Sequence, residues 1–215
     1  MKAIVVAVGI LIVLLGGALV LRSMVYSPAA IGAQRDLAAA NDRMMAAMSD
    51  KAVVYLGDPD VDFVNLMIPH HQGAVDMARI ELKYGTDPKV RDLASRIEAA
   101  QQPQIDQMHR WRLNHTVTRS ADEAAARLAL TAANDHMMKD MHHGPQASSA
   151  PPGKPDHQFL DMMSPHHQGA VEMGEAELKY GTDPEIRALA QAINEVQRRE
   201  IAEMAKLSGG SGHHH

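Results

Sequence analysis

The stretch Met67-Ile68-Pro69-His70-His71-Gln72-Gly73-Ala74-Val75-Asp76-Met77 decides how the chain is interpreted, because it occurs twice. The second copy is Met163-Ser164-Pro165-His166-His167-Gln168-Gly169-Ala170-Val171-Glu172-Met173, at an offset of 96 residues. Between residues 63–97 and residues 159–193, 22 of 35 positions are identical. The sequence therefore predicts an internal duplication in which each copy carries two adjacent histidines flanked by methionines.

The first copy places its polar and sulfur-bearing side chains together if it forms a helix. At 100° per residue, Met67, His70, Met77 and Glu81 lie on one stripe, and His71 lies at the stripe's other edge. That face carries two thioethers, an imidazole and a carboxylate. An arrangement of this kind predicts a metal-ligating surface rather than an ordinary apolar face.

Two further residues of the motif shape the helix itself. Ala74 is small, so we expect a facing helix to approach closely at this point. Pro69 removes one backbone donor and is expected to kink the helix or to mark its first turn.

The bulk composition limits the fold and the function. The chain has 215 residues, 46% of them hydrophobic but only 3% aromatic, so its core must be built from Ala, Leu, Ile, Val and Met. The abundance of Ala, Met, Glu and Gln favours helices. A net charge of −5 argues against nucleic-acid binding. The absence of cysteine excludes disulfides, thiolate zinc sites and thiol catalysis. Fifteen Met and thirteen His remain as soft and borderline ligands.

The N-terminus carries an uncharged, apolar run. Residues 3–21 are long enough to span a bilayer, which predicts a membrane anchor within residues 1–25. The alternative is a secretory signal peptide, with Ser27-Pro28-Ala29-Ala30 as the cleavage region. Either interpretation places the remainder outside the cytoplasm. No cysteine follows the run, so a lipoprotein anchor is excluded.

The remainder divides into two similar parts. Helical repeat one is expected at residues 34–114 and helical repeat two at residues 121–207, each with a Met-bearing helix, a linker, the His-His helix and a final helix. Residues 144–155 are expected to form a mobile loop. Residues 208–215 resemble a linker and a partial His tag.

The same turn signal follows both His-His helices. In the first copy, Gly85 is expected to end the helix in the left-handed conformation, Thr86 or Asp87 to cap the next helix, and Pro88 to occupy its first turn.

These motifs together resemble a known family. Met-x-Pro-His-His-Gln-Gly-Ala with a downstream Met, followed by Tyr-Gly-Thr-Asp-Pro, is similar to the ferritin-like, CopM-type family catalogued as domain of unknown function 305. The resemblance covers residues 36–207. It implies an all-α, four-helix-bundle-like fold and extracytoplasmic copper binding through Met and His. By position, it implies a ligand pool of Met67, His70, His71, Met77, Met163, His166, His167 and Met173.

Ligand softness indicates the metal. Thioethers select Cu(I), and imidazole accepts Cu(I) or Cu(II), whereas Met contributes nothing to a zinc site. A ferritin-like di-iron enzyme needs Glu-x-x-His pairs, which this sequence lacks. Glu81 and Glu177 are interpreted either as partners that orient an imidazole or as salt-bridge residues. A further set of candidate ligands, each also explained by core packing or by exposure, comprises Met44, Met48, Met108, His109, His136, Met137, Met141, His142, His143 and Met204.

The segment 136–143 adds three histidines beside three methionines, whereas its counterpart at residues 43–50 keeps the methionines without histidine. It is interpreted as an accessory copper site or entry point. The alternative is a solvated helix end whose histidines complement the helix dipole.

The favoured interpretation is a membrane-anchored, extracytoplasmic copper-binding protein that holds, buffers or delivers Cu ions and catalyses nothing. Its expected partners are copper ions, the membrane and a copper donor or acceptor protein. The alternative is a helical scaffold subunit of a membrane complex, with Met-rich packing faces. A Cu(I) oxidase is a weaker third interpretation.

Overall fold

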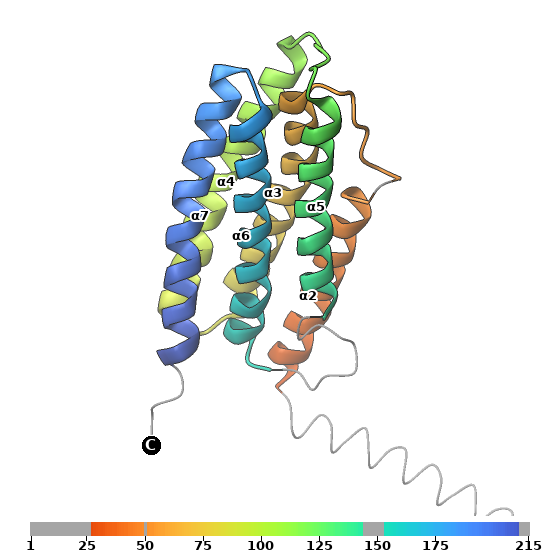
Figure 1. Ribbon diagram of the computed structural model, residues 1–215. Coiled ribbons are helices and arrows are strands. Elements are labelled where there is room, and N and C mark those ends of the chain that lie inside the picture. Colours follow the sequence, from red (N-terminus) through yellow and green to blue (C-terminus); the bar gives the residue numbers. More distant parts are fainter. Residues whose placement is uncertain (1–26, 50, 144–152, 211–215) are drawn as a thin grey trace, which may run out of the picture.

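Six long helices make up the computed structural model, which describes residues 27–49, 51–143 and 153–210 (Figure 1). No strand occurs in these ranges, so the prediction of an all-helical fold is confirmed. In chain order the helices are α2 (Pro28–Ala47), α3 (Pro59–Tyr84), α4 (Pro88–Asn114), α5 (Glu123–His143), α6 (Pro155–Tyr180) and α7 (Pro184–Gly210).

Most helices begin with a proline behind a capping side chain. Ser27, Asp58 and Asp87 each accept a hydrogen bond from a backbone N–H of the first turn that follows. Proline suits the next position because the missing N–H would have no intrahelical partner there. The expected roles of Asp87 and Pro88 are therefore confirmed.

Gly85 departs from expectation. Its backbone is extended, with φ −65° and ψ 151°, so the predicted left-handed conformation is wrong. Glycine is required here for space, because a Cβ atom would overlap the carboxyl group of Glu81. Gly181 and Glu177 repeat this arrangement. Within the described ranges, positive φ occurs at Gly57, with φ 78°.

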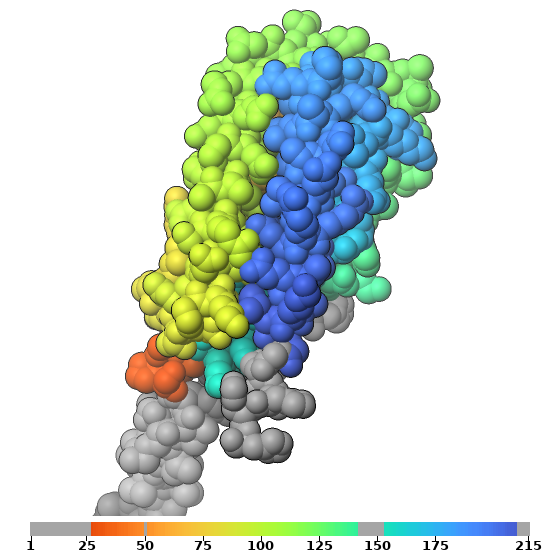
Figure 2. All heavy atoms as spheres, turned by 90° about the vertical axis from the view of Figure 1, so that its left-hand side faces the viewer, coloured from red at the N-terminus to blue at the C-terminus, as the bar shows by residue number. Residues whose placement is uncertain are grey.

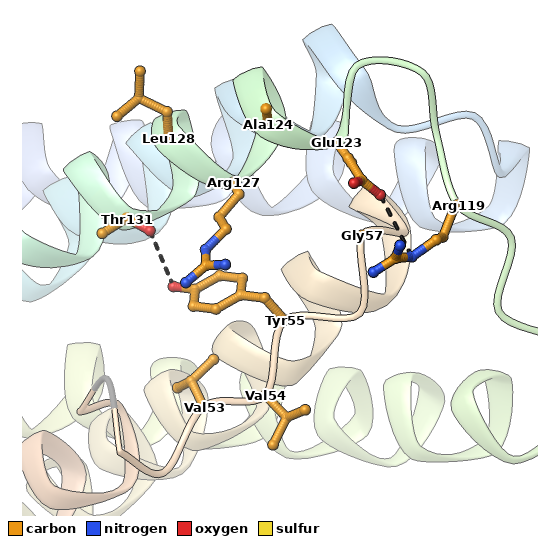
Figure 3. A pocket seen from close by; sticks show the side chains of 10 residues that line it. All are labelled: Val53, Val54, Tyr55, Gly57, Arg119, Glu123, Ala124, Arg127, Leu128 and Thr131. Atoms are coloured by element: carbon orange, nitrogen blue, oxygen red, sulfur yellow. Dashed lines mark hydrogen bonds and ion pairs between the residues drawn. The ribbon is translucent and has the colours of Figure 1, made fainter.

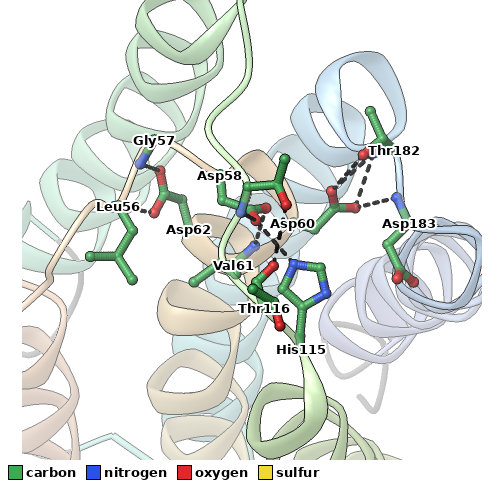
Figure 4. Close-up of polar contacts among 11 residues, drawn as sticks. Leu56, Gly57, Asp58, Asp60, Val61, Asp62, His115, Thr116, Thr182 and Asp183 are labelled. Atoms are coloured by element: carbon green, nitrogen blue, oxygen red, sulfur yellow. Dashed lines mark hydrogen bonds and ion pairs between the residues drawn. The ribbon is translucent and has the colours of Figure 1, made fainter.

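The two His-His helices, α3 and α6, form the centre and run antiparallel. Asp60 at the start of α3 accepts hydrogen bonds from the backbone N–H groups of Thr182 and Asp183, just beyond the end of α6 (Figure 4). Asp156 at the start of α6 accepts the equivalent bonds from Thr86 and Asp87. Each half of the chain therefore caps the other half.

The remaining helices pair on either side of this centre (Figure 1). Helices α4 and α7 lie side by side on one surface, where Arg96 forms an ion pair with Glu203 (Figure 2). Helices α2 and α5 lie on the other side, each packed against both α3 and α6. A Cβ atom on Gly73 would lie 2.5 Å from the sulfur of Met44, so glycine allows α2 to approach α3 closely.

Several predicted boundaries shift. Helix α2 begins at Pro28 rather than Gln34, and α7 continues to Gly210, into the segment interpreted as a linker. Pro69 lies inside α3, ten residues after its start, so it does not mark a first turn. None of the helices described here is both long enough and apolar enough to cross a membrane. The predicted anchor, the His tag and most of the loop at residues 144–155 lie outside the described ranges.

Candidate metal centre

His70 and His166 meet at the middle of the crossing between α3 and α6. The Nε2 atom of His70 donates to the backbone carbonyl of His166 over 3.1 Å, and the reciprocal bond measures 3.0 Å. The ring centroids are 3.7 Å apart and both side chains are fully buried. Ala74 and Ala170 on the same faces are also fully buried, and their small side chains suit such a close crossing. The role of Ala74 as a small contact residue for a facing helix stays a prediction.

His71 and His167 point outward from this crossing to the third helix of each half. The Nε2 atom of His71 lies 2.9 Å from Oε1 of Gln104 on α4. The Nε2 atom of His167 lies 2.7 Å from Oε2 of Glu200 on α7. Both imidazoles are fully buried.

These partners fix the tautomer of the rings. A carbonyl or carboxylate oxygen can only accept, so Nε2 carries the proton in His70, His166 and His167. Gln104 presents its amide oxygen to His71, which gives the same assignment. The four Nδ1 atoms are buried and have no hydrogen-bond partner within the part of the chain that the structure describes. Four buried Nδ1 atoms are therefore left as candidate ligands.

Burial keeps the rings of His70, His71 and His166 neutral. It lowers the pKa of His71 to about 4, against a weaker opposing effect of the hydrogen bond to Gln104. The pKa of His70 falls well below its ordinary value because of burial and of the neighbouring His166. Burial likewise lowers the pKa of His166. Neutral imidazole is the form that ligates a metal.

The predicted thioethers lie in the same interior. All are between 0% and 3% exposed. The set comprises Met44, Met48, Met67, Met77, Met108, Met137, Met141, Met163, Met173 and Met204. Met44 lies over Gly73, one turn from His70, and Met137 lies over Gly169, one turn from His166.

The donor set suits a soft ion. Across residues 27–49, 51–143 and 153–210, no three His, Asp or Glu side chains are grouped as a metal site. The buried thioethers of the same interior are soft ligands of the kind that copper accepts. The donor types present are therefore compatible with a copper-type ion.

Glu81 and Glu177 lie elsewhere, at the two ends of the central helix pair. Glu81 packs under Gly85 beside Asp156, and Glu177 packs under Gly181 beside Asp60. Among the described residues, neither glutamate is hydrogen-bonded to an imidazole. The residues that orient His71 and His167 are instead Gln104 and Glu200, which the sequence interpretation missed.

His136 lies outside the buried cluster. Its side chain is 55% exposed, and its Nδ1 atom is 2.9 Å from Oε2 of Glu172. Arg43 forms the matching ion pair with Asp76 in the other half. His136 therefore occupies the position of an interhelical ion-pair residue. His109 is exposed on α4, and His142 and His143 end α5, where only their backbone is described.

An open groove of about 790 Å³ lies apart from these residues (Figure 3). It is lined by the loop that carries Tyr55 and by the start of α5, and Arg127 lies over the Tyr55 ring, 4.9 Å from its centroid. It contains none of the predicted ligands, so the metal hypothesis concerns the helix interior.

The fold and the buried imidazole–thioether cluster define a class: an all-helical protein with a soft-ligand interior. The chain belongs to the DUF305 family, a domain of unknown function, whose pattern matches residues 60–208. No curated protein matches it.

Two solved structures are similar to this chain. A DUF305 fragment from Deinococcus radiodurans is 30% identical, with a TM-score of 0.50, over 70% of this chain and 95% of that one. CopM in a silver-bound form obtained by soaking is 26% identical, with a TM-score of 0.52, over 72% of this chain and 97% of that one. The assignment to a CopM-like DUF305 family made from the motifs is therefore confirmed.

Proposed function

We propose that this protein binds Cu(I) in the interior between its helices and holds, buffers or delivers that ion outside the cytoplasm. The observation that carries the proposal is the set of four buried Nδ1 atoms that have no hydrogen-bond partner among the described residues, on rings that are each oriented by a hydrogen bond at Nε2. Metal-ligating histidines characteristically donate their other N–H to a carbonyl or carboxylate in this way.

Two further observations support the ion's identity. The buried core of the bundle contains both the four imidazoles and the candidate thioethers, which are soft ligands. A similar structure, CopM, has been obtained with silver bound, and Ag(I) is a soft monovalent ion like Cu(I). The ferritin-like arrangement of the bundle stays a prediction made from the motifs.

An anaerobic titration of the full chain with Cu(I), against a competing chelator, tests the proposal. His213, His214 and His215 are replaced by Ala in every sample, so that the terminal histidines contribute no binding. We expect at least one tightly bound ion per repeat and far weaker binding of zinc. No tight binding, or equal affinity for zinc and Cu(I), would leave the scaffold interpretation, in which the methionines only pack.

We propose the location on separate grounds. The apolar run at residues 3–21 is close to the ~20 residues needed to span a bilayer. Ser27 caps α2 through the backbone N–H of Ala30, so cleavage at the candidate region would remove that cap. Mass spectrometry of the native protein should find the N-terminal segment attached. A mature start between Ala29 and Ile31 would instead identify a signal peptide.

A further inference from the structure

The two halves of the candidate metal centre differ in one residue that contacts an imidazole. Residues 104 and 200 are equivalent at the 96-residue offset, and each holds the Nε2 atom of the outer histidine. Gln104 is neutral, whereas Glu200 is a carboxylate that is 6% exposed. The hydrogen bond is also shorter on the Glu200 side, at 2.7 Å against 2.9 Å.

This difference changes the properties of the imidazole at its other nitrogen. A carboxylate that accepts the Nε2 proton makes the ring a more basic ligand through Nδ1. The hydrogen bond to a charged acceptor is also stronger, so it holds the ring more firmly.

The charge of Glu200 acts in a second way. A cation that enters a buried, apolar region loses its hydration, and it needs a nearby opposite charge to offset that cost. Glu200 supplies such a charge to the half that contains His167. Gln104 supplies none to the half that contains His71.

We infer that Glu200 makes the two halves unequal, so that a monovalent soft cation occupies the His167 half before the His71 half. The inference rests on the proposed function, since it concerns the same ion. Glu200 acts as a positioning residue: it touches the imidazole and not the metal. Partners of this kind change metal affinity by about 10- to 100-fold, which sets the size of the expected difference.

The test is a stepwise addition of Ag(I) to the full chain with residues 213–215 replaced by Ala, followed by NMR of the ¹⁵N-labelled imidazoles. Ag(I) is diamagnetic, so each histidine reports its own occupancy. We expect the Nδ1 signal of His167 to shift in the first step and that of His71 in a later step. Without metal, the Nε2 proton of His167 should resonate further downfield than that of His71, because its acceptor is charged.

Exchange of the two partners provides the matched control. Glu200→Gln should make the two histidines fill together, with affinity in the His167 half lowered about 10-fold or more. Gln104→Glu combined with Glu200→Gln keeps the composition and should reverse the order of filling. Circular dichroism checks that each variant folds, and the order of filling in the protein with Gln104 and Glu200 both intact tests the inference independently of these substitutions.

The outcomes separate the two proposals. Binding at both halves in no particular order, or at His71 first, would overturn the role of Glu200 and leave copper binding intact. No Ag(I) at either histidine would overturn the proposed function itself.

Discussion

At the scale of single residues, the thioethers are the part of the candidate centre where packing and ligation are hardest to separate. Met67 and Met163 lie one helical turn before His70 and His166, and both are fully buried. A buried methionine is ordinarily a flexible gap-filler. Leucine has nearly the same volume and no sulfur, so exchange for leucine removes only the ligand.

We expect Met67→Leu combined with Met163→Leu to lower Cu(I) affinity about tenfold or more, equivalent to ~1.4 kcal/mol. The free energy of unfolding should change by less than about 1.5 kcal/mol per site, because the exchange conserves volume. Competition titration and urea unfolding measure the two effects.

Met162→Leu is the control for this pair. Met162 is 2% exposed, and the equivalent position in the first half is already leucine, Leu66. This variant should leave Cu(I) affinity unchanged. If both leucine variants bind Cu(I) as the unmodified protein does, the methionines only pack.

The histidines and methionines of the interior could be found from the sequence, but the residues that orient them could not be found from the motif alone. Glu81 shares the face of His70, yet it lies eleven residues away, about 16 Å along the helix. Gln104 contacts His71 from a different helix, and this contact depends on how α3 and α4 pack. One signal was present: polar residues interrupt the apolar stripe of the third helix at the same places in both halves, at Gln101, Gln104, Gln197 and Glu200.

At the scale of elements, the ends of the two central helices carry paired buried carboxyl groups. Burial and the charge of Asp156 raise the pKa of Glu81 to about 9. Burial and the charge of Asp60 raise the pKa of Glu177 to about 9. Both glutamates are therefore protonated at neutral pH, and each can donate its proton to the neighbouring aspartate. That aspartate in turn caps the loop of the opposite half.

These shifts predict how stability depends on pH. Between the ordinary glutamate pKa near 4.5 and the folded value near 9, the folded protein binds protons that the unfolded chain releases. Their contribution to stability is therefore fully present below about pH 4.5 and is lost as the pH rises toward about 9. Glu81→Gln combined with Glu177→Gln mimics the protonated acids and should flatten this dependence. Urea unfolding at pH 6 and pH 9 measures it, and an unchanged slope would show that the glutamates carry no proton.

The order and type of the elements followed from the sequence because proline, capping residues and apolar spacing are local signals. Helix α2 begins six residues before the predicted Gln34, because the Ser27 side chain caps it by accepting a hydrogen bond from the backbone N–H of Ala30. The predicted left-handed conformation of Gly85 was wrong because a glycine is needed there to leave space for the Glu81 side chain, and not to adopt a positive φ. The antiparallel crossing of α3 and α6 depends on contacts between residues far apart in the sequence, so local sequence patterns do not predict it.

At the scale of the whole molecule, the chain is arranged about an approximate twofold axis between His70 and His166. This axis relates the two reciprocal bonds of these rings and the reciprocal caps made by Asp60 and Asp156. It also relates the third helices of the two halves, α4 and α7. Two equivalent sets of Nδ1 and thioether donors therefore lie on either side of the axis. The reciprocal bonds also connect the halves, since each ring holds the backbone of the other helix.

This arrangement makes a prediction about the number of sites. His70→Ala combined with His71→Ala should remove about half of the tightly bound Cu(I), because the donors around His166 and His167 remain. The substitution leaves a cavity and removes the bond to the His166 carbonyl, so the free energy of unfolding should fall by about 2–5 kcal/mol. Equilibrium dialysis with elemental analysis gives the stoichiometry, and thermal unfolding by circular dichroism gives the stability.

The mirror variant, His166→Ala with His167→Ala, should remove the other half of the tightly bound Cu(I). If Glu200 acts as inferred, that half contains the ion that binds more tightly. His109→Ala with His157→Ala is the matched control, because both of these histidines are exposed and should change neither quantity. The two-site arrangement requires that each double variant keep the ion of the intact half. If either one loses all binding while its helices remain folded, the rings on the axis, which are only 3.7 Å apart, must build a single centre shared by both halves.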